Sequence, residues 1–405
     1  MGTTSLWLII GLMMSRSVSA LSNIGYFDFP TGAGECTGNE DVLADFMADA
    51  KDLYDGMVAA MDLVSDAAFS TEEEYADYYV ARQLLLGWFG ITFDDHSNVV
   101  DNAESWEILQ DGDGDLTAPT YPANLFCEGS MGNFFDWSAV ALDVDENNIM
   151  VEDQGVSIET LYPTIYAQRN SASSSFGTIK PYYLSSMNRY IFMGNQIDQD
   201  ICATTLNGGE MYGLTMPGYV ASETTTTVTD AAEGPVEVEL TYDVMADTVL
   251  ICPNILTGTV FQYLTLADMT AGTAIEPGSG TGLNTIVTSS STMFHELIHL
   301  TTTWTSDDSI NPHVVVDYTY DVGEAVQLAE GILEIPNDPD EVYDAVYAAL
   351  NAQNYVFFAT AWYNWKNNPV SSDDELSAAV FFAGLPEVWY WPIASEKKAF
   401  KDAGF

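Results

Sequence analysis

The segment TMFHELIHL, from Thr292 to Leu300, carries two histidines and a glutamate within five positions. On a helix His295 and His299 lie on one face, so both imidazoles can bind a single metal ion. Glu296 lies beside them, where it can take a proton from a metal-bound water. The chain has only four histidines, and three of them fall between His295 and His313. This clustering favours a metal site over an ordinary core helix.

A zinc peptidase site needs three protein ligands and one open position. The histidine extension of metzincins is absent, because Thr302 and Thr305 occupy the positions of its Gly and third His. Three candidates for the third ligand follow in the chain, namely Asp317, Glu324 and His313. Residue types and spacing leave the choice among them open.

The region after the HExxH helix resembles a known family. The segment VVVDYTYD places Asp317 three residues before Tyr320, as in the G-T-x-D-x-x-Y-G signature of the deuterolysin-like metalloendopeptidases, or aspzincins. Leu328-Ala329 and the later N-A-x-x-Y-x-x-F-A pattern starting at Asn351 are similar to the family's LA and NADxYxxFA segments. The upstream TVLICPNIL resembles the edge-strand and cysteine segment before its metal helix. The clear match covers about 248–359.

The resemblance implies a set of roles. His295, His299 and Asp317 would bind one Zn²⁺ per chain, Glu296 would act as the base and Tyr320 would donate a hydrogen bond to the transition state. The chain departs from the signature at three positions, with Val314, Val315 and Asp321 in place of Gly, Thr and Gly. Two alternatives are a gluzincin-type peptidase with Glu324 as third ligand and a catalytically inactive secreted binding protein that retains the fold. The intact Glu296 argues against the inactive protein.

The resemblance also locates a segment that contacts substrate. Lysine-specific members of the family carry acidic residues in this segment, where the chain has Gln353 and Val356. A buried lysine ammonium without a carboxylate partner is costly. We therefore expect that lysine is not required after the cleaved bond.

The chain of 405 residues has 60 acidic and 10 basic residues, for a formal net charge of −50. No Lys or Arg occurs between Tyr190 and Trp365. This charge makes nucleic acid and anionic membrane surfaces improbable partners. Residues 1–20 have a short apolar run and a Val18-Ser19-Ala20 cleavage pattern, which predict a signal peptide. We expect a secreted, extracellular monomer without a membrane anchor that acts on protein or peptide substrates.

The four cysteines are Cys36, Cys127, Cys202 and Cys252. An even number in a secreted chain predicts two disulfides, with three possible connectivities. The simplest of these pairs Cys36 with Cys127 and Cys202 with Cys252.

Apolar periodicity predicts helices over 41–68 and over 71–90, the second with Thr71 as N-cap and Glu74 three residues on. The stretch 98–132 is loop-like, and short alternating runs predict strands over about 134–252. Further helices are expected over 284–303 and 338–366. The fold class is α+β, a helix-rich zincin-like metallopeptidase with a small, mainly antiparallel sheet. We expect 21–405 to form a single unit with N-terminal helices at about 41–90 and a zinc-binding core at about 284–366.

Overall fold

The computed structural model divides into two compact units, one formed by Met1–Ala44 and Ala118–Leu256, the other by Asp45–Thr117 and Thr257–Phe405. The predicted signal peptide lies outside the described residues, so it stays a prediction, as does the expectation that 21–405 acts as one peptidase unit. The structure describes all residues except 1–26, 67–70, 95–97, 112–121, 144–145, 152–153, 171–176, 207–208, 217–223, 231–233, 241–246, 272–281, 302, 305–312, 316, 336–337, 368, 373–374, 381–386 and 391–405.

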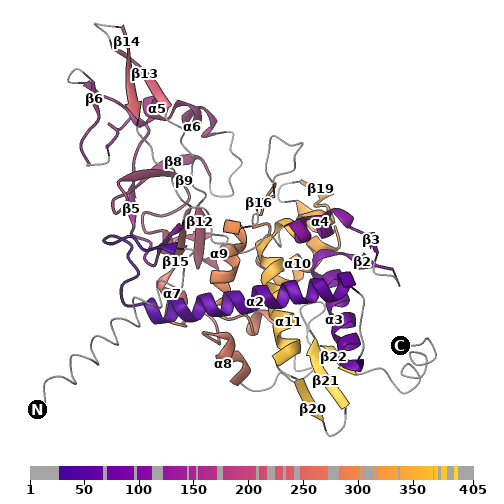
Figure 1. Ribbon diagram of the computed structural model, residues 1–405. Helices are drawn as coiled ribbons and strands as arrows, with labels where there is room; N and C mark the ends of the chain where they lie inside the picture. The colour runs from indigo at the N-terminus through magenta and orange to yellow at the C-terminus, as the bar shows by residue number, and fades with distance from the viewer. Residues whose placement is uncertain are drawn as a thin grey trace, which may run out of the picture. The chain divides into compact units, whose positions relative to one another are not determined.

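The first unit is built mainly of short strands (Figure 1). Its four-stranded sheet has the order β1-β4-β15-β12, with β4 parallel to both β1 and β15 and β12 antiparallel to β15. A second sheet, β5-β8-β9, is antiparallel. The elements are β1 (Phe27–Asp28), β4 (Ala123–Phe126), β5 (Gly132–Phe134), β6 (Met150–Val151), β7 (Gln154–Gly155), α5 (Ile158–Leu161), α6 (Pro163–Gln168), β8 (Ile179–Leu184), β9 (Arg189–Gly194), η1 (Ile201–Ala203), β10 (Thr205–Leu206), β11 (Gly209–Glu210), β12 (Gly213–Met216), β13 (Thr224–Asp230), β14 (Gly234–Leu240), β15 (Thr248–Ile251) and α7 (Pro253–Leu256).

Both disulfides lie in this first unit, and they join Cys36 to Cys127 and Cys202 to Cys252. This is the simplest of the three predicted connectivities. Cys127 and Cys252 directly follow the core strands β4 and β15, so the sheet itself positions one sulfur of each bridge. Cys252 packs in the apolar core with Phe126, Tyr182 and Leu250.

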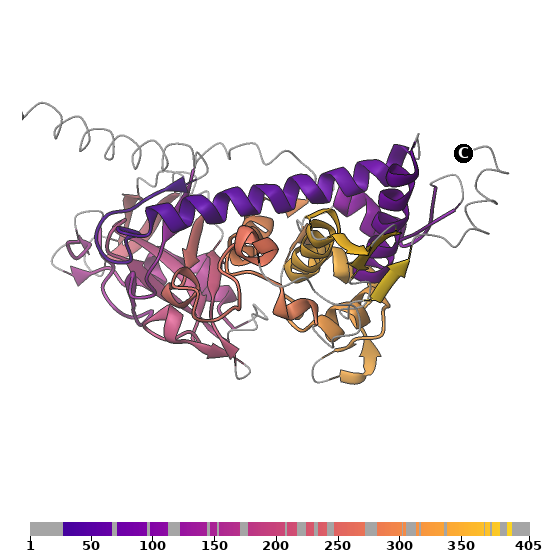
Figure 2. The same ribbon diagram turned by 90° about the horizontal axis from the view of Figure 1, so that it is seen from below.

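The second unit contains the longer helices (Figure 2). Helix α2 (Glu40–Asp66) begins in the first unit and continues into this one, and it buries Phe46, Leu53 and Met57 of the predicted apolar face. The other elements are α3 (Glu72–Phe89), β2 (Thr92–Phe93), β3 (Val99–Asp101), α4 (Ala103–Asp111), α8 (Leu266–Ala271), η2 (Leu283–Thr285), α9 (Ser291–Thr301), β16 (Thr303–Trp304), β17 (His313–Val314), α10 (Val322–Ala329), β18 (Glu334–Ile335), β19 (Asp338–Val342), η3 (Ala345–Leu350), α11 (Ala352–Asn367), β20 (Pro369–Ser372), β21 (Glu375–Val380) and β22 (Glu387–Tyr390).

Helix α3 is bounded by local signals that the sequence predicts. Thr71 accepts a hydrogen bond from the Glu74 N–H and the Glu74 side chain accepts one from the Thr71 N–H, which together form a capping box. The helix ends at Gly90, whose φ of 66° lies in the left-handed region that glycine adopts without strain. Helix α3 packs against α10 and α11.

Three sequence-based expectations for secondary structure are wrong. The stretch 98–132 contains α4 and the core strand β4. The helix expected over 284–303 is confined to 291–301, because Thr288 forms a parallel bridge with Tyr263 and the N–H of Ser289 donates to the Tyr263 carbonyl. The helix expected over 338–366 is a strand, a 3-10 helix and α11, because β19 pairs with β18 and Asn351 is extended.

The overall class agrees with the expectation of α+β, because helices occur together with small, mainly antiparallel sheets. The strand-rich stretch of about 134–252 is confirmed. Most strand pairs are antiparallel, and β4 makes the two parallel pairs among the described strands. Among the described residues no helix is both long and apolar enough to cross a membrane.

Candidate metal centre

The HExxH segment forms a buried helix. Helix α9 starts at Ser291, where the hydroxyl of Thr288 lies 2.7 Å from that of Ser290 and 2.9 Å from that of Ser291. The helix buries all of its residues from Ser291 to Ile298, including His295 and Glu296, and it packs beside α11. A polar cluster inside an otherwise apolar helix is costly unless its members have partners. The role of this cluster is therefore inferred from the partners of the histidines.

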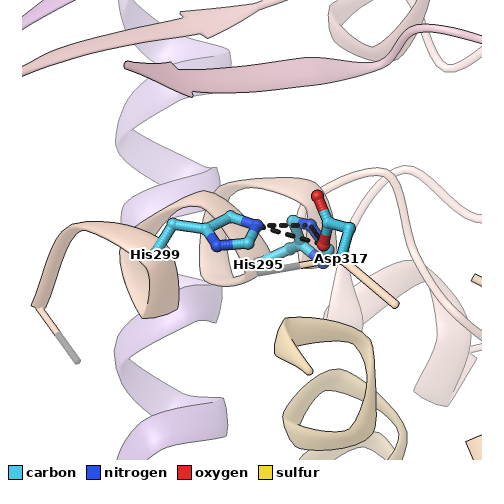
Figure 3. Close-up of side chains that lie close together, drawn as sticks. All are labelled: His295, His299 and Asp317. Carbon is cyan, nitrogen blue, oxygen red and sulfur yellow. Dashed lines mark hydrogen bonds and ion pairs between the residues drawn. The ribbon is translucent and has the colours of Figure 1, made fainter. Parts of the chain in front are cut away.

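Nε2 of His295 and Nε2 of His299 face the same point, beside Asp317 (Figure 3). The Nε2 atoms of His295 and His299 are 3.1 Å apart, and the two rings are nearly perpendicular. This arrangement follows from the spacing of four residues, which places the side chains one turn apart on one face of α9.

Asp317 supplies a third donor atom. Its Oδ1 lies 3.0 Å from Nε2 of His295 and 3.1 Å from Nε2 of His299 (Figure 3). Among the described residues these three form a group that could hold a metal ion. Tetrahedral zinc with bonds of about 2.0–2.1 Å requires ligand atoms roughly 3.3 Å apart. The observed separations are close to this value, so the donor set fits zinc in both chemistry and size.

Nδ1, the second nitrogen of each ring, has an oxygen as its partner. Nδ1 of His295 lies 3.1 Å from Oε1 of Gln353, and Nδ1 of His299 lies 2.9 Å from the carbonyl oxygen of Val315. Each of these oxygens can accept a hydrogen bond from Nδ1–H, and in that tautomer Nε2 of each ring is the atom left to bind a metal ion. Metal-binding histidines commonly have such partners.

Tyr320 completes the group of side chains around Asp317. Its hydroxyl donates to Oδ2 of Asp317 at 2.6 Å, and its ring stacks on that of His295 with centroids 5.6 Å apart. The residue is 62 % exposed as a whole, and Asp317 holds its hydroxyl. Burial of the hydroxyl and the charge of Asp317 raise the pKa of Tyr320 well above its usual value. Tyr320 is therefore a neutral hydrogen-bond donor at the edge of the site.

The ionisable side chains of the site shift one another's pKa values. Burial tends to raise the pKa of Asp317, but the charges and hydrogen bonds of His295 and His299 hold it well below its usual value. Burial tends to lower the pKa of His299, but its hydrogen bond to Asp317 raises that pKa to about 9. Asp317 is thus an anion that attracts positive charge to this point.

Glu296 is 4 % exposed and lies next to His295 in α9. Its charge helps to raise the pKa of both His299 and Tyr320, which places its carboxylate near the donor set. The structure therefore brings together five residues that the sequence singled out, which are His295, Glu296, His299, Asp317 and Tyr320.

Glu324, one of the two other candidates for third ligand, has a different partner. Oε2 of Glu324 accepts a hydrogen bond from the Thr319 hydroxyl at 2.5 Å, and Glu324 does not belong to the donor group. His313 lies in β17, where its backbone pairs with that of Trp304. The geometry thus favours Asp317, as the family resemblance implies.

The departures from the family signature leave the site intact. Val315 contributes through its backbone carbonyl, which any residue supplies. Asp321 is the N-cap of α10 and accepts hydrogen bonds from the N–H groups of Gly323 and Glu324 at 2.8 and 3.1 Å. An aspartate at this position stabilises the helix that follows the loop.

The structure gives Gln353 and Val356 different surroundings from those expected for pocket residues. Gln353 is a partner of His295, a role that the sequence analysis missed. Val356 is 1 % exposed in α11, so the structure lends no support to a substrate contact through this side chain. The only sequence signal for the Gln353 contact was its place in a segment that the family resemblance associates with substrate.

No protein-family model, no curated protein and no solved structure matches this chain.

Proposed function

We propose that this chain is a secreted, zinc-dependent metalloendopeptidase of the zincin type that holds one zinc ion with His295, His299 and Asp317. One observation carries the proposal, which is that three donor atoms from two separate segments lie 3.0–3.1 Å from one another. Two neutral imidazoles and one carboxylate are a common ligand set for catalytic zinc, and they leave one position open.

Zinc, when bound, supplies a Lewis acid that polarises the substrate carbonyl and lowers the pKa of water toward neutrality. Glu296 is the base in this mechanism: it takes the proton of the attacking water and then passes it to the leaving amine. Tyr320, whose hydroxyl proton is donated to Oδ2 of Asp317 in the structure, would turn that proton to the oxygen that becomes negative in the transition state. Gln353 and Val315 keep the two imidazoles in the orientation and tautomer that metal binding needs.

The remaining properties support an extracellular enzyme. Two disulfides are typical of proteins from oxidising compartments. The net charge of −50 disfavours nucleic acid as a partner, so we propose protein or peptide substrates and a monomeric enzyme. The absence of Lys and Arg between Tyr190 and Trp365 means that this stretch offers no cation to stabilise an oxyanion, which makes the Tyr320 hydroxyl more important.

The proposal is tested by metal analysis of the purified protein together with hydrolysis of casein in the presence and absence of a chelator. We expect about one zinc per chain and activity that the chelator abolishes and zinc restores. A protein without bound metal would refute the proposal. Bound zinc without hydrolysis of casein or of a peptide library would identify a binding protein that has kept the fold.

A further inference from the structure

The side chain of Asn351 holds the loop between Asp317 and Tyr320. Its Oδ1 accepts hydrogen bonds from the N–H groups of Tyr318 at 2.9 Å and Thr319 at 3.3 Å. Its Nδ2 donates to the Thr319 carbonyl at 3.2 Å. The amide orientation is fixed by these partners, because a backbone N–H can only donate and a carbonyl can only accept. Asn351 is fully buried, so these bonds are shielded from water.

The held loop lacks regular secondary structure, so its backbone groups need partners from elsewhere. Asn351 supplies them from one side. On the other side the Thr319 hydroxyl donates to Glu324 at 2.5 Å and accepts from the Asp321 N–H at 3.1 Å. The two residues between Asp317 and Tyr320 are therefore fixed from both directions.

Asn351 is itself fixed by a second buried amide. Its Nδ2 donates to Oδ1 of Asn354 at 2.6 Å. Nδ2 of Asn354 in turn donates to the carbonyls of Trp88 at 2.5 Å and Ala325 at 3.2 Å. These hydrogen bonds connect the loop to α3 through Trp88 and to α10 through Ala325.

We propose that Asn351 is a positioning residue of the metal site. It fixes the position of the ligand Asp317 relative to the donor Tyr320. The inference rests on the proposed function. Asn351 acts only through the backbone of Tyr318 and Thr319, and a rotation of the peptide between them would move the side chains on both sides. Catalytic geometry tolerates errors of only about 0.5 Å, so a loose loop weakens both metal binding and turnover.

The test compares Asn351→Ala with a matched control, Asn364→Ala. Asn364 is 1 % exposed and lies thirteen residues further on, about 20 Å along α11. Four quantities are measured: amide exchange of 317–321 in metal-free protein by mass spectrometry, affinity for Zn²⁺, the absorption spectrum with Co²⁺, and kcat and KM for a peptide. Thermal stability is recorded for both variants.

We expect Asn351→Ala to exchange faster in 317–321, to bind Zn²⁺ about 10–100-fold more weakly, to alter the Co²⁺ spectrum and to lower kcat more than it raises KM. Asn364→Ala should lose stability while all four quantities remain those of the parent. If Asn351→Ala loses stability but keeps the parent's loop exchange, Zn²⁺ affinity and Co²⁺ spectrum, Asn351 is only structural and the inference is overturned.

A variant of the same size covers the case in which Asn351→Ala does not fold. Asn351→Asp keeps both acceptor contacts but turns an oxygen toward the Thr319 carbonyl and Oδ1 of Asn354. The same changes in exchange, affinity and spectrum are expected, and parent-like values would overturn the inference. A parent protein that binds neither Zn²⁺ nor Co²⁺ refutes the proposed function as well, whereas an active parent with a parent-like variant refutes only the role of Asn351.

Discussion

The amide oxygen of Gln353 lies 3.1 Å from Nδ1 of His295, although the two residues are 58 positions apart in the chain. This contact fixes the ring of a proposed metal ligand, and losing such a partner typically lowers metal affinity about 10–100-fold. We expect a loss of this size for Gln353→Ala, measured by competition with a zinc-binding dye. Gln353→Glu should restore most of the affinity, because a carboxylate also accepts the Nδ1 proton. The exposed Gln327 in α10 offers a control, and an equal loss in Gln327→Ala would contradict this explanation.

Glu296→Gln removes the proposed base and keeps the size of the side chain. Zinc content should be unchanged, because Glu296 is not a ligand, and turnover should fall about 10²–10⁴-fold. Atomic absorption and hydrolysis of a fluorogenic peptide measure the two effects. Glu330→Gln, at the exposed end of α10, should leave both unchanged. Full activity in Glu296→Gln would exclude the mechanism.

Asp317 and Glu324 are distinguished by metal content. Asp317→Ala removes a donor atom, and we expect zinc affinity to fall by more than the ~100-fold that loss of an outer partner can cost. Glu324→Gln keeps an oxygen that accepts from the Thr319 hydroxyl, so the protein should retain its zinc. Loss of zinc in Glu324→Gln together with its retention in Asp317→Ala would assign the protein to the gluzincin type.

Tyr320→Phe tests the transition-state donor. The variant keeps the ring that stacks on His295 and loses only the hydroxyl, so zinc should remain bound. Loss of one such donor typically lowers kcat about 10²–10³-fold. Tyr347→Phe, in a neighbouring cluster of three tyrosines with Tyr318 and Tyr343, is a control that should keep kcat. Unchanged turnover in Tyr320→Phe would assign the role to another group.

Asp49 in α2 gives a prediction about pH. Its Oδ2 accepts from the Leu266 N–H at 2.8 Å, but burial, together with the charges of Asp52 and Asp45, raises its pKa. A carboxyl with a raised folded-state pKa binds its proton more tightly in the folded protein, so its contribution to stability falls as pH rises above the unfolded value of 3.8. Asp49→Asn keeps an acceptor oxygen without the charge.

We therefore expect Asp49→Asn to raise the Tm at pH 7 relative to the parent, with a difference that shrinks toward pH 3. Thermal unfolding followed by circular dichroism across this pH range measures the effect. Asp62→Asn, on an exposed position of the same helix, is the control and should show a smaller effect. A lower Tm for Asp49→Asn at pH 7 would show that the charge stabilises the fold.

Features determined by neighbours in the chain were predictable from the sequence. The capping box of Thr71 and Glu74 and the glycine at position 90 lie within a turn of the helix ends they set. The pairing of His295 with His299 follows from helical periodicity alone. The choice of Asp317 needed the family motif, because no local pattern brings it to α9.

Features determined by tertiary contacts were missed. The start of α9 depends on a bridge between Thr288 and Tyr263, which periodicity cannot reveal. The interruption of the expected 338–366 helix depends on pairing of β19 with β18 and on the bonds that Asn351 makes with a loop more than thirty positions away. The contact of Gln353 with His295 is of the same kind, because polar side chains find their partners only when helices pack.

The positions of the cysteines affect how the protein loses stability. Both disulfides lie in the first unit, and the chain has no other cysteine, so the unit with the candidate metal centre has no disulfide. Covalent loops stabilise the first unit, whereas the metal ion of the proposed function would stabilise the second through mass action. A thiol reductant and a chelator should therefore weaken different halves of the molecule. The stability of such a protein would depend separately on the redox state and on the metal supply of its surroundings.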